Sequence, residues 1–154
     1  MVSLWCKVRS YMEMYNLIND IKVFGFQVKS FPRGIGDAFE SLIKIVPGGF
    51  ERPYYGISYL DKDGQILYNA TALEKYEGEA EKYNCKRYTI DKGEYVAITV
   101  YDWRQKTDCI KDVFHEIMQD SRVDKTNPAV EWYKNDDEMM CMVQTASSKS
   151  AIPS

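Results

Sequence analysis

The chain has 154 residues, of which 45% are hydrophobic and 28% charged, a composition typical of one globular domain. The net charge of -3, without a Lys/Arg cluster, argues against direct nucleic-acid binding, which needs a basic surface. The sequence contains no run of about 18 uncharged apolar residues that would predict a membrane span, and no signal peptide is recognisable.

Two successive units of strand, helix, strand and strand are predicted. The first consists of a strand at 21–28, a helix at 37–46, and strands at 54–60 and 65–73. The second consists of strands at 86–90 and 94–103, a helix from Thr107 through Met118, and strands at 129–133 and 139–145. Residues 74–82 are expected to be a solvated linker. The units lie roughly 75 residues apart and form a structural repeat with little sequence identity.

Local signals define the ends of several elements. Asp37 is a suitable N-cap for the first helix and Thr107 for the second. Asp61-Lys62-Asp63-Gly64 predicts a hairpin turn between two strands. Gly25 indicates a bulge or a close backbone approach in the first strand.

The fold class that follows is α+β, with one antiparallel sheet and two helices on one face. Because side chains alternate along a strand, Val130 and Trp132 point to one side, and Glu131 and Tyr133 to the other. We expect Val130 and Trp132 to pack beneath the helices. Glu131 would then face away from that core, in a concavity.

The domain is expected to span residues 21–146. Residues 1–20 form a segment of unknown role, and residues 147–154 a disordered tail.

Glu131 is unusual in its strand, since carboxylates are depleted from strands and a buried one costs several kcal/mol unless it is compensated. One interpretation is a solvated carboxylate or a salt bridge to a lysine. The other is a binding role. Among aromatic rings the charge would be poorly solvated and the pKa raised, and a cationic ligand would remove that penalty.

Aromatic residues make up 14% of the chain, including 12 Tyr and 3 Trp. Most could be packing residues, but a subset could give cation-π contacts of about 1–2 kcal/mol each. Tyr133 shares a face with Glu131. Tyr101 and Trp103 are expected on the side of their strand that faces away from the core. The candidate ligand-binding residues are Glu131, Tyr133, Tyr101, Trp103, Tyr55, Tyr59 and Tyr68. Gly56 falls near the position paired with Glu131, where it leaves either open space or a bulge.

No metal site or cofactor is expected. The cysteines, Cys6, Cys85, Cys109 and Cys141, are scattered without a C-x-x-C pair, and the single histidine, His115, lies off the apolar stripe of its helix and is expected to be solvated. An even number of cysteines leaves disulfides open, but reduced thiols and a cytoplasmic location are the preferred interpretation.

The strands "YYGISY", "GEYVAITVYDW", "PAVEWY" and "CMVQ", in this order, resemble those of the GyrI-like small-molecule-binding domains over about residues 20–146. These are effector-binding modules of bacterial AraC-type and MerR-type multidrug-responsive regulators, and they also occur as stand-alone proteins. The resemblance implies two β-α-β-β repeats, of the SHS2 type, with an aromatic pocket between the halves. It also implies a glutamate near the base of that pocket, matched here by Glu131, and binding of amphipathic cationic or aromatic small molecules.

Other roles stay open. Some stand-alone relatives resemble cofactor-free hydrolases of electrophilic, cyclopropane-type compounds. In that case Glu131 would activate water, and Tyr133 or Tyr101 would donate a proton. Others look like gyrase-inhibitor proteins, which would make a protein the partner. About 20 residues precede the first expected strand, too few for a DNA-reading domain, so direct DNA binding is not expected. Because duplication within one chain builds one pocket between the halves, we expect a monomer.

Overall fold

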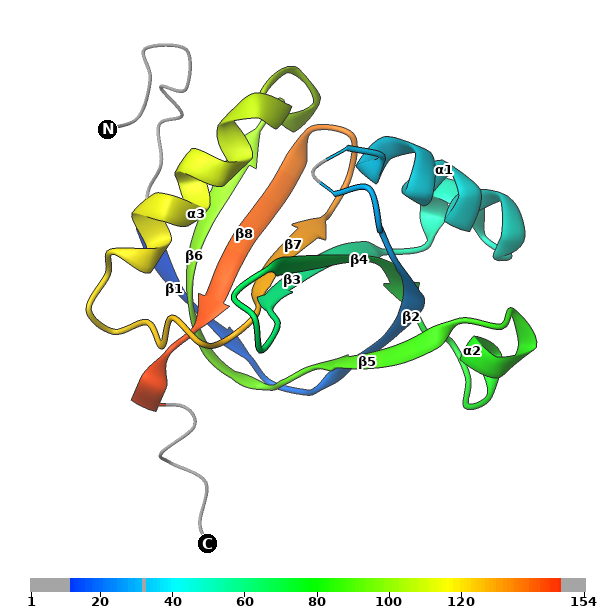
Figure 1. The fold of residues 1–154 in the computed structure, drawn as a ribbon, viewed down its shortest axis with the longest axis horizontal. Coiled ribbons are helices and arrows are strands. Elements are labelled where there is room, and N and C mark those ends of the chain that lie inside the picture. The colour runs from blue at the N-terminus through cyan, green and yellow to red at the C-terminus, as the bar shows by residue number, and fades with distance from the viewer. Residues whose placement is uncertain (1–11, 32, 148–154) are drawn as a thin grey trace, which may run out of the picture.

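The computed structural model describes residues 12–31 and 33–147 and shows an α+β fold built on one antiparallel sheet (Figure 1). The strands are β1 (Met12–Leu17), β2 (Ile21–Gln27), β3 (Tyr54–Leu60), β4 (Ile66–Leu73), β5 (Lys86–Ile90), β6 (Gly93–Tyr101), β7 (Ala129–Tyr133) and β8 (Glu138–Gln144). Their order in the sheet is β1-β6-β8-β7-β3-β4-β2-β5. The helices are α1 (Ile35–Ile45), α2 (Glu79–Lys82) and α3 (Ile110–Met118), with short 3-10 turns η2 (Gly49–Glu51), η3 (Trp103–Gln105) and η4 (Thr107–Cys109).

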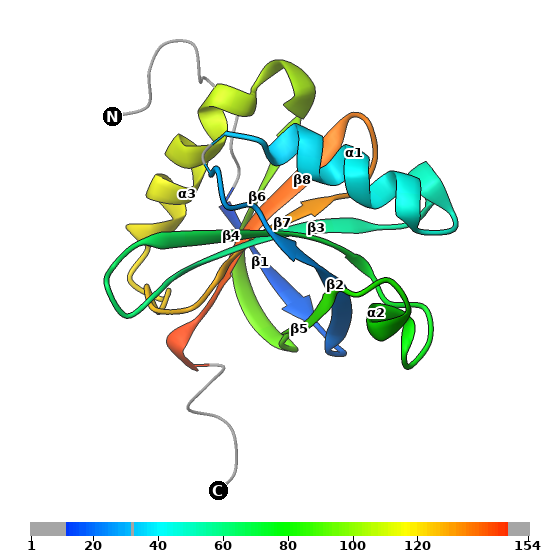
Figure 2. The same ribbon diagram turned by 45° about the vertical axis from the view of Figure 1, so that its right-hand side comes forward.

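The predicted repeat is confirmed. Its two units are β2-α1-β3-β4 and β6-α3-β7-β8, and they join where β3 pairs with β7. Helix α1 packs on β4, and α3 packs on β6 and β8, so both helices cover one face of the sheet (Figure 2). Residues 12–17, for which no role was predicted, form β1 beside β6.

Two local predictions in the first unit are also confirmed. The hairpin closes where the Asp61 N–H donates to the Gln65 carbonyl at 2.9 Å, and Gly64 adopts a φ of 80°. At Gly25 the backbone of β4 comes so close that a Cβ would collide with the Ala70 carbonyl. Only glycine therefore fits at this point of β2.

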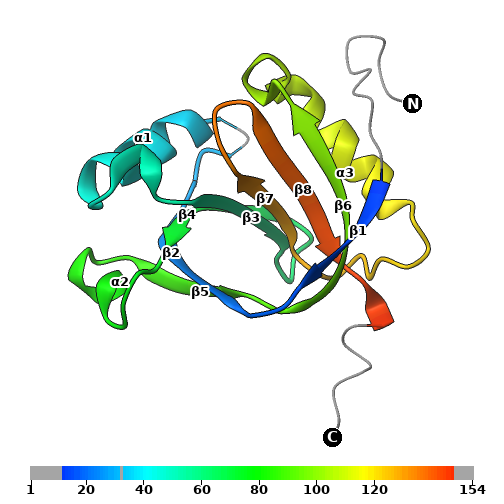
Figure 3. The ribbon, with the colours of Figure 1, turned by 180° about the vertical axis from the view of Figure 1, so that it is seen from behind.

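The sheet carries a hydrophobic core on each face. Beneath α3, Val113 and Ile117 pack against Val96, Ile98 and Val100 of β6. The opposite face curls around a second core (Figure 3), whose buried members are Leu17, Val23, Tyr55, Ile57, Ile90, Tyr95, Ala97, Val130, Met140 and Met142. Because burying a large apolar side chain is worth about 1.5–3 kcal/mol, both cores hold the sheet in its curved form.

The helices begin at residues other than the predicted caps. Helix α1 begins at Ile35, behind an N-cap at Gly34, and not at Asp37. Helix α3 begins at Ile110 with Cys109 as its N-cap, because η3 and η4 occupy the preceding residues and Thr107 lies in η4. Neither observed cap makes a side-chain hydrogen bond, so the usual Ser/Thr/Asp signal for a helix start is missing here.

The expectation that residues 74–82 are a solvated linker is wrong. Helix α2 lies within this segment and its Glu79 side chain is fully buried. Arg52 Nη1 donates to Glu79 Oε1 at 2.8 Å, and the Lys75 backbone N–H donates to the same oxygen at 2.8 Å. The connection between the two repeats is therefore fastened to the turn that precedes β3.

Among the described cysteines, Cys85 and Cys141 are free thiols and Cys109 is disulfide-bonded. The expectation of reduced thiols is therefore wrong for Cys109. Cys6 lies outside the described residues, as do most of the predicted N-terminal segment and nearly all of the predicted tail. Within the described ranges, no helix has both the length and the apolar character needed to cross a membrane.

Candidate functional site

Strand β7 directs Glu131 to the face of the sheet that carries the helices. Its neighbours of the same parity, Ala129 and Tyr133, pack with the core beneath α3, whereas Val130 and Trp132 pack in the core on the other face. The predicted orientation of this strand is therefore wrong. It failed because both faces of the sheet are packed, so apolar Val130 and Trp132 do not identify the helix side.

The Glu131 carboxylate is held by two tyrosines. The Tyr68 hydroxyl, from β4, donates to Glu131 Oε1 at 2.5 Å, and the Tyr133 hydroxyl donates to the same oxygen at 2.7 Å. Such short distances are typical of hydrogen bonds to an ionised acceptor. The two hydroxyl oxygens lie 3.4 Å apart. The first repeat thus contributes Tyr68, and the second contributes Glu131 and Tyr133.

No cation of the described chain neutralises this carboxylate. None of the ion pairs among the described residues involves Glu131. Its second oxygen, Oε2, accepts no hydrogen bond from residues 12–31 or 33–147, because both described donors go to Oε1. The residue is partly buried, so Oε2 stands in a partly desolvated environment without a donor from the described residues.

Burial controls the protonation of all three groups. It raises the pKa of Glu131, although the hydrogen bonds from Tyr68 and Tyr133 act in the opposite direction. Burial, followed by the negative charge of Glu131, raises the pKa of both tyrosine hydroxyls well above the ordinary value. Both tyrosines therefore keep their protons and remain donors.

Gly56 creates the room for this arrangement. It pairs with Glu131 across β3 and β7 in unbroken register, so it is not a bulge. A Cβ at Gly56 would lie 2.5 Å from Glu131 Oε1 and 2.8 Å from Tyr68 Cζ. The space beside Gly56 is thus filled by the carboxylate and the tyrosine.

Three further aromatic side chains pack around the two tyrosines. Phe31 stacks on Tyr68, with ring centroids 5.3 Å apart. Phe39 of α1 and Trp103 of η3 contact Tyr133 edge-on, at 5.2 Å and 5.0 Å. We call these five residues the aromatic shell: Phe31, Phe39, Tyr68, Trp103 and Tyr133. It contains side chains from both repeats, and all of its members except Tyr68 are only partly buried.

Of the residues predicted to bind a ligand, Tyr68, Trp103 and Tyr133 lie in this shell. Phe31 and Phe39, which also lie in it, were not predicted. Phe39 was read only as part of the apolar stripe of its helix. Phe31 stands in the turn before α1, and an aromatic residue in such a turn is the one signal that could have indicated it.

The remaining predicted residues lie elsewhere. Tyr55 and Tyr59 belong to the opposite face, where Tyr55 stacks on Trp132. Tyr101 pairs with Glu138, has the parity of that opposite face and is 54% exposed. His115 is exposed, as predicted, and its ring lies 2.8 Å from the Gln119 amide.

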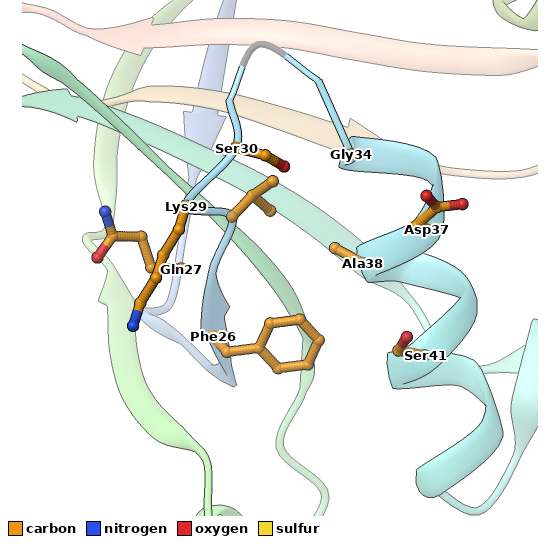
Figure 4. Close-up of a pocket in the computed structure, with 9 residues that line it drawn as sticks. Phe26, Gln27, Lys29, Ser30, Gly34, Asp37, Ala38 and Ser41 are labelled. Atoms are coloured by element: carbon orange, nitrogen blue, oxygen red, sulfur yellow. The ribbon is translucent and has the colours of Figure 1, made fainter.

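A hollow of about 410 Å³ lies between the end of β2 and α1, within the first repeat (Figure 4). Figure 4 shows the Phe26 ring directed toward α1, while Gln27 and Lys29 point away from it. The lining residues are Phe26, Gln27, Val28, Lys29, Ser30, Gly34, Asp37, Ala38 and Ser41. Glu131 does not line this hollow, although Val28 and Ala38 pack in one cluster with Tyr68. Across residues 12–31 and 33–147, no His, Cys, Asp and Glu side chains gather in a group able to hold a metal ion.

Neither a protein-family model nor a curated protein matches the chain. Solved structures share its fold. SAV2435 bound to tetraphenylphosphonium has a TM-score of 0.63 at 12% identity, over 92% of this chain and 97% of that chain. A transcription regulation protein from Staphylococcus aureus MU50 has a TM-score of 0.56 at 13% sequence identity, over 87% of this chain and 98% of that chain. A hydrolase from Listeria innocua has a TM-score of 0.55 at 13% sequence identity, over 88% of this chain and 92% of that chain. The chain therefore has a fold found in small-molecule-binding and regulator-like proteins.

Proposed function

We propose that the chain is a GyrI-like effector-binding domain that captures amphipathic, aromatic cations at Glu131. The observation that carries the proposal is the partly buried Glu131 carboxylate, which has two tyrosine donors on one oxygen, no described donor on the other and no cationic partner in the described chain. The tetraphenylphosphonium bound to SAV2435 is a ligand of this chemical type.

The binding energy would come from two sources. Pairing with a cation removes the penalty of a poorly solvated carboxylate. Contact of a positively charged aromatic ligand with the exposed parts of the aromatic shell adds cation-π and stacking interactions, worth about 0.5–2 kcal/mol each. A neutral aromatic molecule would gain only the stacking part of the second contribution.

Titration calorimetry with a charged and a neutral ligand of similar shape tests the proposal. Tetraphenylphosphonium is the cation, and triphenylphosphine oxide is the neutral comparison. Glu131→Gln is expected to weaken binding of the cation by about tenfold or more, because it removes the coulombic attraction between the carboxylate and the phosphonium, and a loss of about 1.4 kcal/mol is already tenfold. The neutral ligand should change far less. Equal losses for both ligands, or no binding of either, would contradict the proposal.

Hydrolysis at the same carboxylate is the second candidate. It is favoured by the raised pKa of Glu131 together with an Oε2 that accepts no hydrogen bond from the described residues, features of a carboxylate able to activate water. Tyr101 faces away from the site, which leaves Tyr133 or Tyr68 as the proton donor. Incubation with an electrophilic cyclopropane compound, followed by product analysis, separates the candidates. Turnover abolished by Glu131→Ala would establish catalysis, and binding without turnover would leave the effector-binding function.

A further inference from the structure

The two hydrogen bonds that Glu131 accepts are distributed unequally over its carboxylate. Both tyrosine hydroxyls donate to Oε1, and no described residue donates to Oε2. An ionised carboxylate offers about four acceptor positions, two on each oxygen. The described residues therefore occupy both positions of Oε1 and neither position of Oε2.

We infer that the site selects among N–H-bearing cations by the way they present their donors, favouring an ammonium over an amidinium or guanidinium. This inference rests on the proposed function and specifies its ligand class. A planar forked cation binds a carboxylate best with one N–H on each oxygen. Here the second N–H would compete with Tyr68 and Tyr133 for Oε1. An ammonium group can pair with Oε2 through donors on one nitrogen and does not need Oε1.

The two tyrosines are held too firmly to give way to a forked ligand. Tyr68 is only 2% exposed and one face of its ring is covered by Phe31. Tyr133 is contacted edge-on by Phe39 and by Trp103, which come from different repeats. Turning either hydroxyl away from Oε1 would disturb these ring contacts. The occupancy of Oε1 is therefore a fixed property of the site.

A matched pair of ligands tests the inference on the full chain. 4-Phenylbenzylamine and 4-phenylbenzamidine share a biphenyl body, and both are cations at neutral pH. Calorimetry with the wild-type protein should show the amine binding at least about fivefold more tightly, since the amidine loses one charge-assisted hydrogen bond. 4-Phenylbenzyl alcohol serves as the neutral reference.

Removal of one tyrosine hydroxyl should weaken or reverse the preference for the amine over the amidine. Tyr133→Phe or Tyr68→Phe frees one acceptor position on Oε1, so the ratio of amine to amidine affinity should fall toward one or below it. Tyr54→Phe is the control. Tyr54 lies on the same face of β3, but its hydroxyl donates to the Gly49 carbonyl at 2.6 Å and not to Glu131. Circular dichroism identifies any variant that does not fold. The affinity ratio of each tyrosine variant is compared separately with that of the wild-type protein, so that one folded variant is sufficient for the test.

The possible outcomes separate the inference from the proposed function. If neither cation binds more tightly than the alcohol, the proposed function fails. If both cations bind but the wild-type protein prefers the amidine or shows no preference, the inference fails and the function stands. An amine preference that persists in both tyrosine variants would also overturn it, because the preference would not depend on the occupancy of Oε1.

Discussion

Gly56 and Glu131 lie opposite each other on paired strands, and the carboxylate of Glu131 occupies the volume that a side chain at Gly56 would need. The Tyr68 ring enters the same volume from β4. The three residues therefore form one arrangement, in which the missing side chain of one strand makes the hydrogen bond between the other two strands geometrically possible.

Gly56→Ala is expected to separate Tyr68 from Glu131. The new Cβ would lie 2.8 Å from Tyr68 Cζ, and Tyr68 is buried, so the ring cannot move aside freely. Overpacking of this kind costs about 1–3 kcal/mol. Thermal unfolding should show a lower Tm, and calorimetry should show weaker binding of tetraphenylphosphonium.

Gly36→Ala is the control, because Gly36 lies in α1 with nothing within 4 Å of its added Cβ. It should stabilise the protein by about 0.5–1 kcal/mol. A Gly56→Ala protein with unchanged Tm and affinity would contradict the packing argument.

The pKa of Glu131, raised by burial, predicts opposite pH dependences for binding and stability. Cation binding needs the ionised carboxylate, so the affinity should be constant above the raised pKa and fall as the pH drops through it. Stability behaves in the reverse sense. The folded state binds the proton more tightly than the unfolded state, so this contribution is present at low pH and is lost as the pH rises through the folded pKa.

Glu131→Gln separates these effects. Its cation affinity should be low and independent of pH. Its Tm relative to the wild-type protein should increase as the pH is raised, because only the wild-type protein carries a poorly solvated charge at high pH. Differential scanning calorimetry and ligand titrations between about pH 4 and pH 8 measure both quantities. A difference in Tm that does not vary with pH would show that Glu131 is well solvated.

Trp103 and Tyr101 were equivalent candidates in the sequence, but the structure separates them. Trp103 contacts Tyr133, whereas Tyr101 is exposed on the other face. Trp103→Ala should weaken binding of tetraphenylphosphonium by about 0.5–2 kcal/mol, the range of one cation-π contact. Tyr101→Ala should leave the affinity unchanged within error. Loss of affinity in the Tyr101 variant would place the ligand on the opposite face.

Periodicity in the sequence was sufficient to predict the repeat of strands and helices, because each element has its own pattern of apolar residues. It was not sufficient to orient β7. Val130 and Trp132 are apolar because they face a second core, and a single strand does not reveal that both of its sides are packed. The same limitation affected Tyr55, which is buried on the opposite face, and Tyr68, which reaches Glu131. Only the pairing of β3 with both β4 and β7 decides between these tyrosines.

The buried ion pair between Arg52 and Glu79 was hidden for a different reason. The residues lie in segments that read as a turn and a polar linker, and neither segment shows an apolar pattern. Arg52 also donates to the Pro47 carbonyl at 3.0 Å and to the Leu73 carbonyl at 3.1 Å. Burial raises the pKa of Glu79, but the hydrogen bonds from Arg52 and Lys75, with their positive charges, outweigh it and lower the pKa below 4.5.

Arg52→Met should therefore destabilise the protein strongly. It leaves the Glu79 charge buried without its partner, which costs about 3–5 kcal/mol, or a Tm lower by roughly 10 °C. The matched control is Arg104→Met, since Arg104 pairs with Asp136 through side chains that are 55% and 89% exposed, and such surface pairs contribute about 0–1 kcal/mol. Because the pKa of Glu79 is lowered in the folded state, its stabilising contribution is present above pH 4.5 and is lost as the pH falls through the folded pKa. The Tm difference between the wild-type and Arg52→Met proteins should thus be largest near neutral pH and shrink in acid. A difference that is small at every pH, or no larger than that of Arg104→Met, would show that the pair does not fasten the connection between the repeats.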